Sequence, residues 1–170
     1  MQGVPGVFND IAFILKRYYK TAMEAMIDCE IETNFSVKDG VSALSDAFSC
    51  LSQCVLGDNI ERAQAQAGRA FTEAILSFRQ QIHAYKSAQI ESFVKEIRAY
   101  EYLLAADEQV RLQEILRRNK DLGYCEHAWI REDWEDACNK YKEAAEEFDV
   151  TIDCLDDLLV ELKSRKIMMG

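Results

Sequence analysis

The chain has 170 residues, 49% of them hydrophobic, and this length and composition predict one globular domain with a buried core. One proline and seven glycines are too few for the many turns of a β-sandwich or barrel, which argues against those classes. The formal net charge of −10 argues against non-specific phosphate binding, because affinity for nucleic acid depends largely on Lys and Arg. We therefore expect no direct binding of nucleic acid.

The sequence gives two indications of the cellular compartment. It contains no apolar run of about 18 residues, and its first residues lack the basic and apolar regions of a secretory signal. Most of the six cysteines lie within helical patterns, where a reduced thiol acts as a small apolar residue. These cysteines are Cys29, Cys50, Cys54, Cys125, Cys138 and Cys154. We expect a cytoplasmic protein with reduced thiols.

Apolar residues recur at three- and four-residue steps through most of the chain, which predicts helices. The first predicted helix covers about residues 10–32 and the second about residues 37–56, with a capping signal at Ser36 and Asp39. Gly40 weakens the second helix by about 1 kcal/mol relative to alanine. The expected core stripe of the second helix is Val37, Val41, Leu44, Phe48, Leu51 and Val55.

A long helix is predicted next, over about residues 59–104, with Asp58 and Glu61 as its capping signal. Its residues 63–70 are mostly small, so a partner helix could approach closely there. The long helix either continues to Lys120 or breaks near Asp107. In the second case a shorter helix covers residues 107–120 and ends at Asp121-Leu122-Gly123.

The last predicted helix, over about residues 126–166, has the clearest pattern. Large apolar residues occupy every seventh position, which indicates a packed seam between helices. The seam consists of Trp134, Tyr141, Phe148, Leu155 and Leu162. Since aromatic side chains are bulky for a tight two-stranded coiled coil, we expect them to pack against the small residues 63–70 of the long helix.

These patterns predict an all-α fold: an elongated antiparallel bundle of four or five coiled-coil-like helices, forming a single domain over residues 1–170. The first two helices together roughly match the length of the third, so a monomeric bundle is feasible. A homodimer in which two chains share one core is the alternative. Aromatic residues on more than one face of the long helix favour the dimer.

The acidic residues of the last helix fall on the face turned away from the seam. Residues 121–170 hold 14 acids and 6 bases, so most of the net negative charge lies there. The face consists of Glu132, Glu135, Asp136, Glu143, Glu146, Asp149, Asp153, Asp156 and Asp157. Such a face would steer toward a basic partner surface. We expect that reversing Asp149, Asp153, Asp156 and Asp157 to lysine leaves folding intact and abolishes partner capture.

Residues suited to metal binding or catalysis are sparse. Cys125 and His127 are close in sequence, but no second pair completes the four ligands of a zinc site. His83 has Arg79 and Ser87 one turn to either side, and neither is a typical metal partner. There is no Gly-x-Ser-x-Gly elbow and no glycine-rich phosphate loop. We predict no catalytic residues, no metal and no cofactor.

Two paired carboxylates favour an enzyme as an alternative. Glu132-x-x-Glu135 and Asp153-x-x-Asp156 superficially resemble the magnesium-binding motifs of all-helical nucleotide pyrophosphohydrolases. Those enzymes bring their motifs together from two antiparallel helices. Here both pairs are expected on one helix, roughly 30 Å apart, and the second begins with Asp where the family has Glu. We therefore interpret these carboxylates as a solvated surface.

The sequence favours a non-enzymatic helical interaction protein, such as an adaptor, a scaffold or a protein inhibitor, that presents its acidic face to a basic partner protein. The first alternative is a membrane-associated elongated helical dimer. The net charge of −10 and the lack of Lys/Arg clusters count against it, because cytoplasmic leaflets are anionic. The second alternative is the magnesium-dependent pyrophosphohydrolase, which requires a break in the last helix between Asp136 and Asp153.

Overall fold

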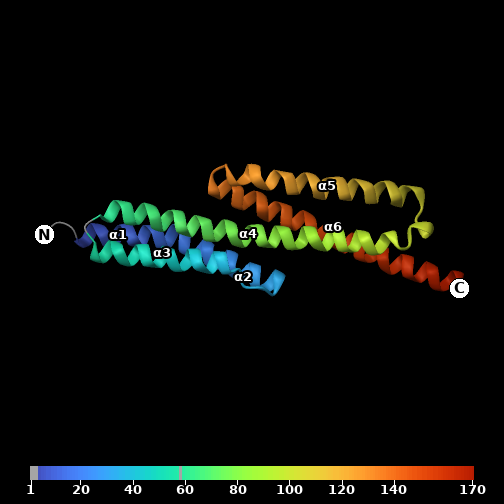
Figure 1. Ribbon diagram of the computed structural model, residues 1–170, viewed down its shortest axis with the longest axis horizontal. Helices are drawn as coiled ribbons and strands as arrows, with labels where there is room; N and C mark the ends of the chain where they lie inside the picture. The colour runs from blue at the N-terminus through green and yellow to red at the C-terminus, as the bar shows by residue number, and fades with distance from the viewer. Residues whose placement is uncertain (1–3, 58) are drawn as a thin grey trace. The chain divides into compact units, whose positions relative to one another are not determined.

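The computed structural model describes residues 4–57 and 59–170, and its regular elements over these ranges are all helices (Figure 1). The prediction of an all-α helical bundle is confirmed. Contacts divide the chain into two compact units, Met1–Ile82 and His83–Gly170, to both of which the long helix α4 (Ile60–Arg98) contributes. The number of independently folding domains stays a prediction. No described helix is long and apolar enough to span a membrane.

The first unit begins with thirty helical residues in three consecutive elements. These are α1 (Val4–Ile14), the π-helical η1 (Leu15–Tyr19) and α2 (Lys20–Thr33), so the helix begins before the predicted residue 10. The π turn shifts the phase of the helix, which a search for a 3.6-residue period does not detect. The helix ends at Asn34, whose φ of 57° is left-handed and whose backbone N–H donates to Glu30 O at 2.9 Å.

Helix α3 (Lys38–Leu56) follows, with a core face that differs from the predicted stripe. Its buried residues are Gly40, Leu44, Ala47, Leu51 and Cys54. Val41, Phe48 and Val55, expected in the core, are 42–59% exposed. The core face of α3 is thus rotated relative to the predicted stripe. This rotation follows from close packing at Gly40, where an added Cβ would lie 2.6 Å from Cε1 of Phe78. A pattern that counts only large apolar residues misses a core made of small ones.

The predicted caps of α3 and α4 need correction. Val37 is the N-cap residue of α3, and no side chain caps this end, so the Ser36 and Asp39 capping box is wrong. At the start of α4, Oδ1 of Asn59 accepts from the N–H of Arg62 at 3.3 Å. The predicted cap at Asp58 lies outside the described residues.

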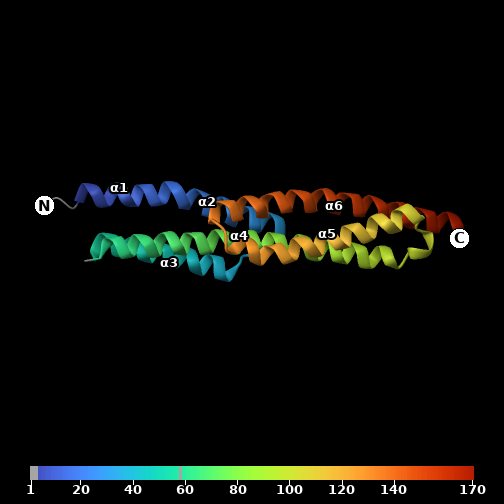
Figure 2. The ribbon, with the colours of Figure 1, turned by 90° about the horizontal axis from the view of Figure 1, so that it is seen from above.

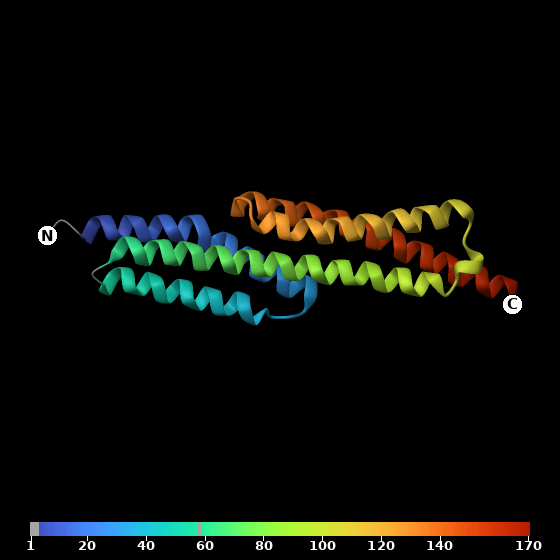
Figure 3. The same ribbon diagram turned by 45° about the horizontal axis from the view of Figure 1, so that its top comes forward.

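Within the first unit, α1–α2, α3 and the first part of α4 run along one another (Figures 2 and 3). α1 and α4 have the same chain direction, and α3 runs in the opposite direction. The core contains the small residues of α4 together with large rings from the same helix. It includes Ala22, Ala25, Leu44, Ala47, Leu51, Ala67, Phe71, Ala74, Ile75 and Phe78.

The second unit contains the remainder of α4, the short 3-10 turn η2 (Glu101–Leu103), α5 (Ala106–Ile130) and α6 (Trp134–Met169). Helix α4 ends at Arg98, and the chain turns back into α5, which confirms a break near Asp107. The cap at this break is Glu108, whose carboxylate accepts from the N–H of Ala105 at 2.8 Å.

Two predicted boundaries in the second unit are wrong. Helix α5 does not end at Gly123 but continues to Ile130, since Gly123 does not adopt the positive φ of a glycine that ends a helix. Helix α6 begins at Trp134 and not at residue 126, the predicted start. Asp133 caps it, since its Oδ1 accepts from the N–H of Glu135 at 2.9 Å. The heptad spacing of the seam does not reveal the turn before Trp134, so the predicted helix started too early.

Candidate functional site: the acidic face of α6

All nine carboxylates of the predicted acidic face are exposed, and eight of them lie on α6. At about 100° per residue these eight fall on one side of the helix. The opposite side carries Tyr141, Phe148, Leu155 and Leu162, each at most 1% exposed. Trp134, the first seam residue, lies at the helix start and is half-buried. The structure therefore places the acids and most of the seam on opposite faces of α6.

Glu132 and Asp149 each form an ion pair with a lysine. Glu132 lies in the turn before α6, where both its carboxylate oxygens accept from Lys140 Nζ, at 2.7 and 2.6 Å. Asp149 forms an ion pair with Lys86 of α4, whose side chain is only 4% exposed. Asp149 lies exposed on the predicted face, and it also compensates the buried charge of Lys86.

The carboxylates that form no ion pair with a described residue are the ones available to contact a partner. They are Asp136, Glu143, Glu146, Asp153 and Asp157. Asp156 lies near Lys163, where it helps to raise the pKa of that ammonium group; the main cause is the hydrogen bond with Glu96. The free acids recur along about six turns of the helix, from Asp136 to Asp157, so their field adds up over an extended strip.

The buried side of α6 surrounds a histidine from α4. His83 is 1% exposed, and its ring centroid lies 5.0 Å from Phe148 and 5.6 Å from both Trp129 and Tyr141. The seam aromatics thus contact His83, where the sequence analysis expected the small residues 63–70. Burial lowers the pKa of His83, and its Nε2 has no hydrogen-bond partner.

Two ion pairs between α5 and α6 flank this core. Arg118 of α5 donates to both carboxylate oxygens of Glu147, at 2.8 and 3.1 Å, and this pairing raises the pKa of Arg118. Arg165 makes the same two-pronged contact with Glu108, at 2.9 and 2.8 Å, which lowers the pKa of Glu108. Such planar pairs fix the rotation of α6, so the orientation of its acidic face is set.

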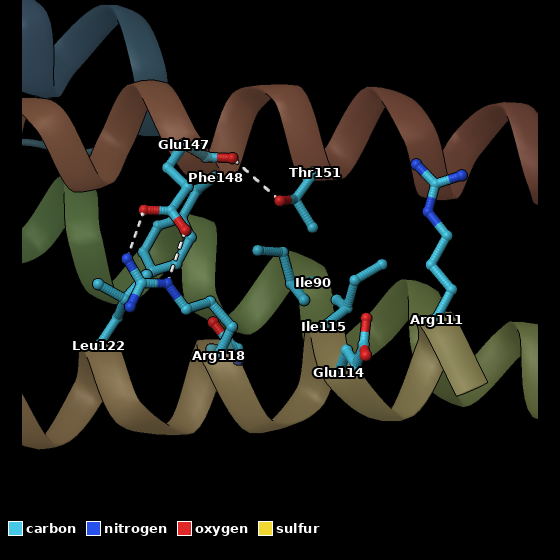
Figure 4. Close-up of a pocket in the computed structure, with 10 residues that line it drawn as sticks. Ile90, Arg111, Glu114, Ile115, Arg118, Leu122, Glu147, Phe148 and Thr151 are labelled. Carbon is cyan, nitrogen blue, oxygen red and sulfur yellow. Dashed lines mark hydrogen bonds and ion pairs between the residues drawn. The ribbon is translucent and has the colours of Figure 1, made fainter. Parts of the chain in front are cut away.

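A cavity of about 240 Å³ lies between α5 and α6 beside these contacts (Figure 4). Its apolar walls include Ile90, Ile115, Leu122 and Phe148, and the Arg118–Glu147 pair spans it at one end. Because Glu147 compensates the charge of Arg118, this end of the cavity carries little net charge.

The residues weighed for metal binding are not brought together. Cys125 and His127 are both exposed on α5, and His83 is enclosed by rings. Glu132 lies in a turn, while Asp153 lies five turns into α6. In residues 4–57 and 59–170, no group of three or more His, Cys, Asp or Glu side chains is arranged to hold a metal ion.

Sequence reasoning missed the polar residues inside the second unit. His83 and Lys86 lie three residues apart on the face of α4 that also carries Ile90 and Val94, and this spacing was the available signal. Asn119 of α5 is also buried and accepts from the hydroxyl of Ser87 through Oδ1 at 3.0 Å. Trp129 was missed because α5 was ended too early.

Comparison of the chain with protein-family models, with curated proteins and with solved structures finds no match.

Proposed function

We propose that the chain is a helical interaction protein that binds a basic partner protein through the acidic face of α6. The observation that supports this most strongly is a row of carboxylates that pair with no described residue, on a helix whose other side is buried: Asp136, Glu143, Glu146, Asp153 and Asp157. A surface adaptor, scaffold or protein inhibitor would present charge in this way. The binding needs no cofactor.

Physical chemistry favours recognition by charge at this surface. Like charges along one strip repel each other, and a basic surface would relieve that repulsion on contact. The buried seam and the Arg118–Glu147 and Arg165–Glu108 pairs hold the strip in place. Little conformational entropy is therefore lost on binding. Electrostatic complementarity of this kind raises association rates and gives a strong salt dependence.

The test compares two variants with the same change in charge. The acidic-face variant carries Glu146→Lys, Asp153→Lys and Asp157→Lys, all at exposed positions that form no ion pair within the described part of the chain. The control carries Glu30→Lys, Asp46→Lys and Glu91→Lys, at exposed acids of α2, α3 and α4. Each purified protein is immobilised and exposed to host extract at low and high ionic strength, and bound proteins are identified by mass spectrometry.

The proposal expects a basic protein that the wild type and the control retain at low ionic strength and that the acidic-face variant does not. High ionic strength should release it from both. Equal retention by all three proteins would contradict the proposal, as would equal loss from both variants. Circular dichroism of each variant checks that the helices are intact.

A further inference from the structure

The first unit contains a cavity of about 460 Å³ between α1–η1 and the first part of α4. This volume lies in the range of small-molecule sites in proteins. The walls include Asp10, Phe13, Tyr18, Gln64, Gly68 and Arg69. The cavity is separate from the acidic face, so the inference does not depend on the proposed function.

The π-helical turn η1 forms part of this wall. π turns are rare within α-helices and are frequently found at functional sites. This one contributes Tyr18, whose ring stacks on Phe71 with centroids 6.3 Å apart. Across the cavity lies Gly68, where a Cβ would come to 3.6 Å from Cε2 of Tyr18. A larger residue than glycine at position 68 would reduce the space beside the tyrosine ring.

The wall also contains a polar atom that lacks a partner. Nε2 of Gln64 is buried and makes no hydrogen bond. Buried amide donors in native proteins are nearly always paired with protein, water or ligand. The neighbouring Thr72 hydroxyl is already used, since it donates to the carbonyl of Gly68 at 2.9 Å. A ligand with a hydrogen-bond acceptor near the middle of the cavity would satisfy Gln64.

The two ends of the cavity carry opposite charges. Helices α1 and α4 run in the same direction (Figure 3). Asp10 and Glu61, the first lining residues of each helix, therefore lie at one end of the cavity, and Arg69 lies toward the other. None of the three forms an ion pair with another described residue. The eight residues from Glu61 to Arg69 correspond to about 12 Å along the helix. Between the ends, Phe13, Ile14 and Ala65 provide apolar surface.

We propose that this cavity binds a short zwitterion with an apolar middle, and specifically a peptide of about three residues with free termini. An extended tripeptide spans about 10 Å, which matches the separation of the charged ends. Its ammonium group would lie at Asp10 and Glu61, its carboxylate at Arg69, and its apolar side chains against Phe13 and Ile14. A peptide carbonyl would accept from Nε2 of Gln64.

The test titrates the full chain with the tripeptide Leu-Ala-Leu by isothermal calorimetry. Three forms are compared: the peptide with free termini, the N-acetylated peptide and the C-amidated peptide. The free peptide should bind, and each capped form should bind about tenfold more weakly because one charge contact is lost. Equal binding of the three forms, or no binding of the free peptide at millimolar concentration, would overturn the proposal.

Matched variants assign the two ends. Arg69→Gln should abolish the difference between the free and the C-amidated peptide and keep the difference for the N-acetylated one. Asp10→Asn with Glu61→Gln should give the reverse pattern. The control is Arg62→Gln, because Arg62 is exposed on the same helix but does not line this cavity. If Arg62→Gln weakens binding as much as Arg69→Gln, the binding is non-specific attraction and the proposed site is wrong.

Discussion

The imidazole of His83 packs against the ring of Phe148 with 5.0 Å between their centroids, in a core where Nε2 of His83 makes no hydrogen bond. A protonated imidazole in this position would be a buried charge close to rings and to Lys86, itself 3% exposed. Burial therefore lowers the pKa of His83 below its ordinary value of 6.5. Burial in the second unit thus favours the neutral form of His83 over the protonated form.

This contact predicts acid destabilisation. Since the pKa of His83 is lower in the folded than in the unfolded chain, the unfolded state binds more protons below about pH 6.5. Stability is full above that value and falls as pH decreases toward the folded pKa, by at most about 1.4 kcal/mol per pH unit. Urea unfolding at a series of pH values should show this slope in the wild type and lose it in His83→Phe.

His127 provides the control for that measurement, because it is exposed on α5. The variant His127→Phe should keep the slope of the wild type. Burial raises the pKa of Glu126, which acts in the opposite direction, and comparing variants at the same pH cancels its contribution. An unchanged slope in His83→Phe would show that other groups cause the acid sensitivity.

Asp149 and Asp157 should respond differently to neutralisation although both are exposed on α6. Asp149→Asn removes the charge that compensates buried Lys86 and is expected to cost about 1–3 kcal/mol of unfolding free energy. Asp157→Asn should change stability by less than about 0.5 kcal/mol. Chemical denaturation measures both. Equal effects would mean that the Lys86–Asp149 pair does not stabilise the fold.

Gly40 and Gly123 test close packing against helix propensity. At position 40 a Cβ would lie 2.6 Å from Phe78, so Gly40→Ala should destabilise the chain by about 1–3 kcal/mol despite the better propensity of alanine. At position 123 no atom lies within 4 Å, so Gly123→Ala should stabilise by about 0.5–1 kcal/mol. Thermal unfolding of the two variants should shift in opposite directions, and a stabilising Gly40→Ala would contradict the packing.

The seam of α6 was predictable because large residues at a seven-residue spacing leave few alternatives for a helix. Phe148→Ala should therefore cost about 3–5 kcal/mol, as for other fully buried phenylalanines. Trp134 is half-buried at the start of the helix, so Trp134→Ala should lower the free energy of unfolding by clearly less. Urea unfolding of the two variants compares the costs, and a larger loss at Trp134 would mean that the core extends to the N-terminal end of α6.

Other features were beyond the reach of periodicity. The core of α3 uses Gly40, Ala47 and Cys54, whose small side chains carry almost no hydrophobic signal, so Phe48 was assigned to the core instead. The π turn at Leu15–Tyr19, whose Tyr18 ring stacks on Phe71, leaves no signal in a search for a 3.6-residue period. The exposure of the acids followed from the heptad register, but the partner of Asp149 did not, because Lys86 lies 63 residues away in the chain.

The central claim is tested most directly by the affinity of the purified chain for the basic protein that it captures, measured by calorimetry over a range of ionic strength. For the wild type and the control with Glu30, Asp46 and Glu91 reversed, we expect the same affinity, falling as ionic strength rises. For the variant with Glu146, Asp153 and Asp157 reversed, we expect at least a tenfold weaker affinity at low ionic strength. Equal affinities of the two variants, or an affinity independent of salt, would contradict recognition through the acidic face of α6.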